Sequence, residues 1–146
     1  IREVLMMVHH LGRYADRIVN FECDRHIMAD VNAAQVKQVI LNLIANGLQA
    51  TTSGGRVNVR LQELVDTIVI EIQDDGCGMD EETLQHIFDP FYTTKEAGQG
   101  TGLGLSITHR IIENHSGTIT PLSNGPGCGS TFRIRLPKRQ LQTNAA

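Results

Sequence analysis

The stretch GQGTGLGLSITHR, residues 98–110, carries a glycine at every second position from 98 to 104, and an apolar pattern of helical spacing follows. Glycine leaves the backbone without side chains and frees φ, at a cost in ordering entropy. Bare amide groups directly before a helix attract anions, because the N-terminal end of a helix carries a partial positive charge. The segment therefore predicts phosphate binding, but glycine-rich loops are common, and the rest of the chain has to specify the ligand.

Three familiar phosphate-binding motifs are absent from the chain. GxxxxGK[ST] fails because no Lys-Ser/Thr pair follows these glycines. The dinucleotide fingerprint GxGxxG fails because leucine stands where its third glycine is required. The catalytic-loop signature of protein kinases is missing as well. If these glycines bind phosphate, they do so in a site of another kind.

Length, composition and charge restrict the class of protein. The 146 residues suit a single domain with one substantial core, and 40% apolar with 20% charged residues is typical of a globular chain. A net charge of −3 without a basic stripe argues against nucleic acid, and no apolar run predicts contact with a membrane. Three widely spaced cysteines favour a reducing, cytoplasmic setting. The chain starts at Ile1 rather than Met, so we expect it to be part of a longer protein.

Apolar periodicity predicts an α/β protein, an α+β two-layer sandwich with a mixed, mostly antiparallel sheet and helices packed on one face. The expected helices cover residues 1–19, 32–51, 80–88 and 104–115. Asp30 or Asn32 is expected to cap the second helix, and Asp80 the third. Residues 56–62 and 67–73 predict an antiparallel hairpin, residues 117–122 and 130–136 two closing strands, residues 21–29 a strand pair or a strand and loop, and residues 89–103 a mobile loop.

Five segments in chain order resemble the N, G1, F, G2 and G3 boxes of the ATP-binding catalytic domain of sensor histidine kinases. They are NLIANGLQA (42–50), DDGCGM (74–79), FDPFYTTK (88–95), GQGTGLGL (98–105) and GPGCGSTF (125–132). The resemblance extends over about residues 18–137 and is closest to nitrogen-regulatory-type kinases. It implies the Bergerat-type ATP-binding fold of the superfamily of gyrase, Hsp90 and MutL, with ATP and Mg²⁺ as cofactors.

The resemblance also implies a domain organisation. Residues 1–18 would form a helix leading from a dimerisation and phosphoacceptor region, residues 19–137 the ATP-binding domain, and residues 138–146 a frayed tail. The family's phosphoacceptor is a histidine followed by an acidic residue, with a proline a few positions further on, and His9 and His10 lack both companions. We therefore expect the acceptor histidine upstream, on a helical hairpin, with a response regulator downstream and this fragment monomeric.

Two asparagines of the N box lie four residues apart, on one face of the helix predicted over residues 32–51. An amide carbonyl is a hard oxygen ligand of the kind that Mg²⁺ prefers. By resemblance, Asn46 is the metal ligand and Asn42 a supporting polar group on the phosphate side; otherwise both amides simply face solvent. The relatives that hydrolyse ATP carry a glutamate at position 42 as a general base, and an asparagine lacks that basicity. The γ-phosphoryl group would then be kept for transfer to another acceptor.

The adenine end is assigned by resemblance to the G1 and G3 boxes. Asp74 would accept a hydrogen bond from the adenine amino group, and Gly76 and Gly78 would let the backbone pass close to the ring. A carboxylate here disfavours guanine, whose carbonyl oxygen would face it unpaired. Ser130 or Thr131 would reach the adenine, directly or through water, and the residues do not decide between the two hydroxyls.

The phosphate end is assigned to the F and G2 boxes. Lys95 is the nearest cation to the phosphates in the resemblance, although a plain surface lysine is an equal reading. The backbone amides that would hold the triphosphate belong to Gly100, Thr101, Gly102, Leu103 and Gly104. Asn42, Asn46 and Lys95 form the expected catalytic set. Two other functions on the same fold are an anti-sigma-factor-type serine kinase, whose N box carries an acidic residue, and a module that only senses ATP.

Overall fold

The computed structural model describes residues 1–9, 14, 16–23, 25–95 and 100–139. Within them the chain forms helices α1 (Arg2–His9), α2 (Ala33–Ala50), α3 (Glu81–His86) and α4 (Gly104–Asn114). The strands are β1 (Ile18–Cys23), β2 (Arg56–Glu63), β3 (Thr67–Asp74), β4 (Thr118–Leu122) and β5 (Ser130–Pro137). None of the helices in these ranges combines the length and apolar character that crossing a bilayer requires.

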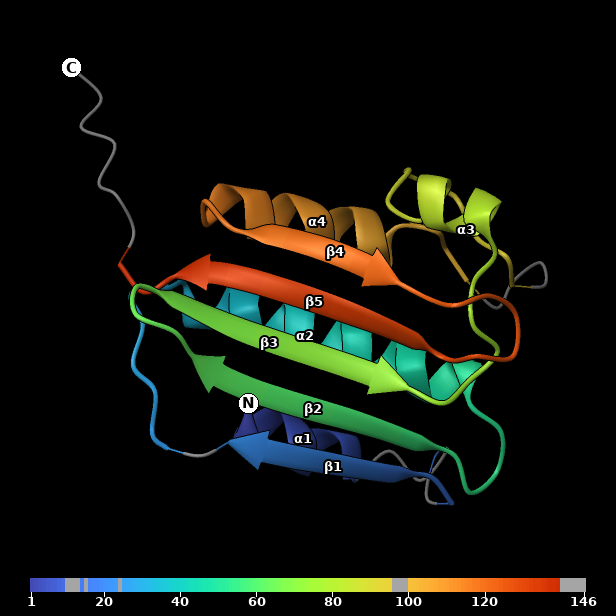
Figure 1. The fold of residues 1–146 in the computed structure, drawn as a ribbon, viewed down its shortest axis with the longest axis horizontal. Helices are drawn as coiled ribbons and strands as arrows, with labels where there is room; N and C mark the ends of the chain where they lie inside the picture. Colours follow the sequence, from blue (N-terminus) through green and yellow to red (C-terminus); the bar gives the residue numbers. More distant parts are fainter. Residues whose placement is uncertain (10–13, 15, 24, 96–99, 140–146) are drawn as a thin grey trace.

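The five strands form one sheet in the order β1-β2-β3-β5-β4. β1 pairs with β2 in parallel and the other three pairs are antiparallel, as expected because the α2 crossover separates β1 from β2 while a tight turn joins β2 to β3. Figure 1 shows α1, α2 and α4 on the same face of this sheet. The predicted mixed, mostly antiparallel sandwich is confirmed.

The core lies between that face of the sheet and the helices α2 and α4. Strand β5 alternates between buried and less buried positions, as expected for a strand with one covered face. The side chains of Ile44 on α2, Ile112 on α4 and Ile134 on β5 are completely buried. Burial of this one apolar stripe holds both helices against the sheet and thereby fixes the cleft described below.

The opposite face of the sheet is polar. The strand register aligns Glu22, Arg60, Glu71 and Arg133 in one row across four strands. Arg60 Nη2 lies 2.9 Å from Glu22 Oε2, and Arg133 Nε lies 2.5 Å from Glu71 Oε1. Alternating charges in a cross-strand row attract one another and stay hydrated. This row explains why the helices cover only the other face.

The first predicted helix is wrong at its C-terminal end. Helix α1 spans Arg2–His9, residues 10–13 and 15 lie outside the described part, and Ile18 already belongs to β1. From Val19 the side chains alternate between covered and exposed, which suits a strand better than a helix. Of the two readings for the following segment, a strand and a loop is the right one. Residues 96–99 of the predicted loop, and residues 140–146 of the tail, also lie outside the described part.

Both helix caps follow local rules. Asn32, not Asp30, caps α2: its Oδ1 accepts a hydrogen bond from the Gln35 N–H at 3.1 Å. Asp80 caps α3 as predicted, accepting from the Thr83 N–H at 2.8 Å. A side-chain acceptor at this position satisfies an N–H group that has no partner inside the helix.

Replacement of Ile44 by alanine tests the core. Because Ile44 is fully buried, Ile44→Ala should lower the free energy of unfolding by about 2–5 kcal/mol. Met28, which is 72% exposed, provides the control: Met28→Ala should change stability by about 0.5 kcal/mol or less. Urea titration monitored by circular dichroism measures both values, and equal effects would contradict the packing described here.

Candidate functional site

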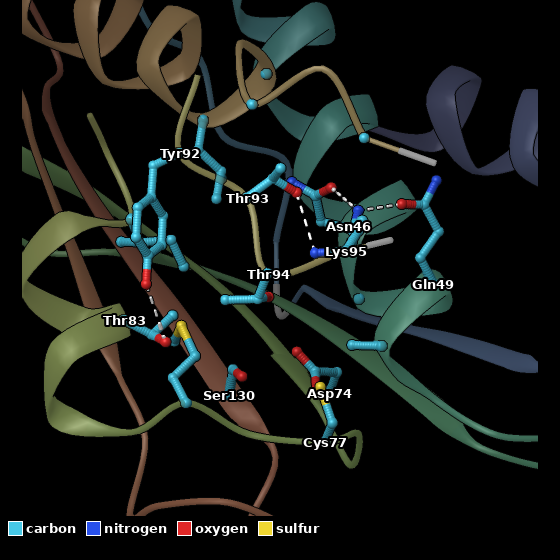
Figure 2. Close-up of a pocket in the computed structure, with 18 of the residues that line it drawn as sticks. Asn46, Gln49, Asp74, Cys77, Thr83, Tyr92, Thr93, Thr94, Lys95 and Ser130 are labelled. Carbon is cyan, nitrogen blue, oxygen red and sulfur yellow. Dashed lines mark hydrogen bonds between the residues drawn. The ribbon is translucent and has the colours of Figure 1, made fainter. Parts of the chain in front are cut away.

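A cleft of about 700 Å³ opens between the C-terminal half of α2, the end of β3, α3, the segment 92–95 and the start of α4 (Figure 2). It is lined by residues from all five of the boxes. The predicted residues that line it are Asn42, Asn46, Asp74, Gly78, Lys95, Gly100, Thr101, Gly102, Gly104 and Ser130. The structure therefore brings together side chains that are up to 88 positions apart in sequence, between Asn42 and Ser130.

Asp74 stands at the floor of the cleft, at the last position of β3. Its side chain is 93% buried, and its Oδ1 accepts a hydrogen bond from the Gly76 N–H at 2.9 Å. Burial raises the pKa of Asp74 above the ordinary value for an aspartate, and the neighbouring charge of Asp75 raises it further. Backbone hydrogen bonds from Gly76 and Ser130 oppose this shift. A buried carboxyl group held in one orientation can select its hydrogen-bond partner.

Glycines around Asp74 allow backbone to pack against backbone. A Cβ at Gly76 would lie 2.5 Å from the Ala50 carbonyl oxygen, and a Cβ at Gly129 would collide with the carbonyl oxygen of Asp74. The Gly129 N–H donates to the Gly76 carbonyl at 3.1 Å, and the Cys77 N–H donates to the Ala50 carbonyl at 3.1 Å. The G1 and G3 loops are thus hydrogen-bonded together. These glycines have a packing role within the protein besides the predicted approach to a ring.

The N box faces the other end of the cleft. Asn42 Nδ2 donates to Thr108 Oγ1 at 2.9 Å, and Asn46 Oδ1 accepts from Lys95 Nζ at 3.2 Å. Lys95 Nζ also contacts Gln49 Oε1, as Figure 2 shows. Partial burial lowers the pKa of Lys95, and the nearby Cys77 thiol opposes the shift. Lys95 is thus an exposed residue whose ammonium group contacts two amide oxygens of the N box.

Residues 87–95, which follow α3, are hydrogen-bonded both to α3 and to the glycine-rich segment before α4. The Phe91 N–H donates to the Gly102 carbonyl at 2.9 Å, and both residues have positive φ, 68° and 65°. Tyr92 Oη donates to Thr83 Oγ1 at 3.3 Å. Phe88 packs between Phe132 and His109, with ring centroids 6.5 and 4.8 Å away. Phe91, by contrast, is 74% exposed and does not pack against this cluster.

Three predicted residues, Gly76, Thr131 and Leu103, do not line the cleft, and several that line it were not predicted, among them Thr93 and Thr94. Strand alternation turns Ser130 into the cleft and Thr131 to the polar face of the sheet, where it lines a second depression. Leu103 is the N-cap residue of α4 and does not line the cleft. Thr93 and Thr94 do line it. Two adjacent hydroxyl residues in FDPFYTTK were the available signal for them.

The oxygen atoms at the N-box end of the cleft suit a hard divalent cation that is held by the protein and a phosphate together. Within the described residues no group of three or more His, Cys, Asp or Glu side chains could hold a metal ion. Asn46 Oδ1 is already directed at a cationic group, the Lys95 ammonium. Mg²⁺ is commonly held by one or two protein oxygens plus phosphate and water, so a single amide oxygen fits it.

Gly129→Ala tests whether the G3 glycines are needed for packing. Gly129 and Gly127 both have positive φ, 68° and 78°, but only Gly129 faces other backbone where a Cβ would be. Gly127→Ala should cost about 1–2 kcal/mol of stability, the ordinary cost of alanine in this conformation. Gly129→Ala should cost clearly more because it adds a collision with Asp74. Thermal unfolding compares the two variants, and equal losses would contradict the backbone contact.

The pKa of Asp74 gives a pH-dependent prediction. A raised pKa in the folded state means that ionised Asp74 opposes folding. This cost begins to shrink as pH falls through the folded-state pKa and is gone below the unfolded-state pKa. In Asp74→Asn the side chain is uncharged at every pH, and it keeps an oxygen that can accept from the Gly76 N–H. The variant should unfold at a higher urea concentration than wild type at pH 7, and the difference should shrink toward about pH 4. A difference that does not vary with pH would contradict the assignment.

The family model described as histidine kinase-, DNA gyrase B-, and HSP90-like ATPase matches residues 31–140. The signal transduction histidine-protein kinase AtoS of Escherichia coli (strain K12) is 38% identical over 140 residues, covering 94% of this chain and 22% of AtoS. The chain spans between 14% and 22% of the length of three of its curated relatives.

Solved structures agree with this sequence match. The nucleotide-free catalytic domain of histidine kinase ThkA has a TM-score of 0.83 and 31% identity, covering 94% of this chain and 91% of that one. ThkA in complex with the response regulator protein TrrA has a TM-score of 0.78 and 29% identity, covering 94% of this chain and 39% of that one. The structure has the fold of a histidine kinase catalytic domain, and all five boxes line its cleft. Since the family model also matches most of the chain, the chain belongs to the family of histidine kinase-, DNA gyrase B- and HSP90-like ATPases.

Proposed function

We propose that this chain is the ATP-binding kinase domain of a sensor histidine kinase, which transfers the γ-phosphoryl group of ATP to a histidine on a separate helical hairpin. The observation that carries the proposal is that Asn46, Asp74 and Gly102 line one cleft. A cation ligand, a purine-selective carboxyl group and a bare backbone segment are the three elements that a Mg·ATP site requires. Together they match the polyphosphate and the base of one nucleotide.

The adenine end would be the floor of the cleft. Asp74 would accept a hydrogen bond from the exocyclic amino group, with Ser130 beside it in the β3–β5 register. Met79 and Phe132 are largely buried and line the same cleft, which gives the base an apolar wall. Guanine presents a carbonyl oxygen at this position, so its binding would leave two acceptors facing each other.

The phosphate end would lie between the N box and the start of α4. Asn46 Oδ1 would hold Mg²⁺, and Lys95 would move from Asn46 to the phosphates, since one oxygen cannot be fully shared between the two cations. The backbone from Gly100 to Gly104 would donate its N–H groups to the triphosphate, because the first amides of a helix have no partner inside it. When bound, Mg²⁺ would neutralise phosphate charge that builds up during transfer.

The chemistry favours transfer over hydrolysis. In transfer, the bond between the γ-phosphorus and its bridging oxygen breaks, ADP leaves with the electron pair, and a bond forms to an imidazole nitrogen of the acceptor. The chain has to position the nucleotide and to neutralise charge, and these are the two requirements of phosphoryl transfer. Asn42 cannot act as a general base toward water because an amide has no useful basicity. The same residue makes the serine-kinase alternative, with an acidic N box, less suitable.

The finer assignments extend this proposal. The GTGLGLSI run supports the nitrogen-regulatory subtype, and we place the domain in the cytoplasm, where its nucleotide is made. The acceptor hairpin would belong to the same full-length kinase, and a response regulator would receive the phosphoryl group, as the complex of ThkA with the response regulator protein TrrA suggests by similarity. We expect the isolated chain, residues 19–137 with their flanks, to be monomeric.

Titration with ATP and GTP tests the nucleotide site. Wild type should bind Mg·ATP, and GTP at least tenfold more weakly. Asp74→Asn should lose about tenfold or more in ATP affinity and most of its preference over GTP, which corresponds to about 1–3 kcal/mol for one lost polar contact. Asn46→Ala should abolish the gain in affinity that Mg²⁺ gives. Calorimetry with and without EDTA measures each value, and equal binding of ATP and GTP by wild type would overturn the adenine assignment.

Kinase activity requires the full-length protein. There, Asn46→Ala should abolish incorporation of radiolabelled γ-phosphate into histidine. Met28→Ala, which replaces an exposed residue that does not line the cleft, should leave it unchanged. Acid-labile, base-stable label identifies a phosphohistidine. Label that appears on serine would favour the serine-kinase alternative. Tight nucleotide binding without any transfer would favour the ATP-sensing one.

A further inference from the structure

A threonine of α4 lies beneath the cleft, in contact with the N box. Thr108 is 99% buried, on the same helix as the buried Ile111 and Ile112. A hydroxyl group in apolar surroundings costs free energy unless it is hydrogen-bonded. Its Oγ1 accepts from Asn42 Nδ2 at 2.9 Å, across 66 positions of sequence. Thr108 is therefore bonded to one particular end of the Asn42 amide.

That bond leaves the two ends of the amide in different surroundings. Nδ2 is bonded to Thr108, and Oδ1 is the nearer of the two ends to Gly104: a Cβ there would lie 2.6 Å from Oδ1 and 3.0 Å from Nδ2. Asn42 and Gly104 both line the cleft, at the point where α4 begins. On the same helix, Asn46 Oδ1 faces the Lys95 ammonium. The carbonyl oxygen of Asn42 thus lies beside the start of α4, and that of Asn46 lies beside Lys95.

We propose that Thr108 is a positioning residue that fixes the orientation of the Asn42 amide, so that its carbonyl oxygen and not its NH₂ group faces the phosphate end of the cleft. The inference rests on the proposed function for the identity of the ligand, a hydrated Mg²⁺ bound with ATP. An oxygen acceptor suits a cation and its water molecules, whereas an NH₂ donor would suit a phosphate oxygen. Because Thr108 Oγ1 accepts from Asn42 Nδ2, the carbonyl oxygen is the end of the amide that remains for the ligand.

Substitution at Thr108 separates this role from packing. Thr108→Val removes the hydroxyl and keeps the shape of the side chain, so that Asn42 Nδ2 loses its partner and the amide is free to rotate. Thr108→Ser keeps the hydroxyl and removes a methyl group. If Thr108 only packs, Thr108→Ser should be the more harmful change. If Thr108 positions Asn42, Thr108→Val should be the more harmful change. Circular dichroism melts confirm that each variant is folded.

The first measurement needs no nucleotide. In the nucleotide-free protein, the side-chain NH₂ protons of Asn42, assigned by comparison with Asn42→Ala, should exchange with solvent slowly in wild type and in Thr108→Ser. In Thr108→Val they should exchange at least tenfold faster. The NH₂ signals of Asn20, whose side chain donates to Asn58 on β2, provide an internal reference that should not change. Equal exchange in wild type and Thr108→Val would overturn the proposal.

The second measurement is a double-mutant cycle on ATP binding. Thr108→Val should raise the Kd for Mg·ATP about tenfold, change the Kd in EDTA less than twofold, and have no further effect when Asn42 is already alanine. Thr108→Ser should stay within twofold of wild type. An equal effect of Thr108→Val with and without Asn42 would overturn the proposal. If wild type binds no Mg·ATP, the proposed function fails, while the exchange measurement still decides the orientation of Asn42.

Discussion

The close approach of two backbone loops, residues 75–79 after β3 and residues 125–129 before β5, is the constraint on which the site depends. The loops share hydrogen bonds that only residues without a Cβ permit, Gly76 and Gly129 in particular. Their contact prolongs the β3–β5 pairing to its last pair, Asp74 and Ser130. A carboxyl group can remain at a 93% buried position, against its desolvation cost, only because this frame supplies its hydrogen bonds.

Helix α2 joins that frame to the rest of the cleft. One of its faces contributes Leu43, Ile44 and Leu48 to the core, and another contributes Asn42 and Asn46 to the cleft. Its C-terminal end accepts the Cys77 N–H through Ala50, so the helix is tied to the loop behind Asp74. Core packing therefore positions the cation ligands relative to the adenine end. A loss of packing at α2 would disturb both ends of the cleft together.

Charge is divided along the cleft in the way that a nucleotide requires. Of the two aspartates that line the cleft, Asp74 lies at the buried floor, and the basic residue Lys95 lies at the exposed opposite end. Burial disfavours the charged form of both, raising the pKa of the acid and lowering that of the base. The phosphate end otherwise relies on amide oxygens and backbone N–H groups, which carry no net charge and can face a polyphosphate or a cation.

The sequence by itself determined three of the four helices, most of the strands and the Asp80 cap, because apolar periodicity and capping are local properties. The order of the five boxes came from the resemblance to a known family. It did not decide between Ser130 and Thr131, nor place Ile18 in a strand, because strand register depends on pairing partners far along the chain. It also did not reveal Thr93 and Thr94 at the cleft or the bond between Thr108 and Asn42. These depend on how α4 and the preceding loop pack against α2, and only the tertiary structure brings such distant side chains within hydrogen-bonding distance.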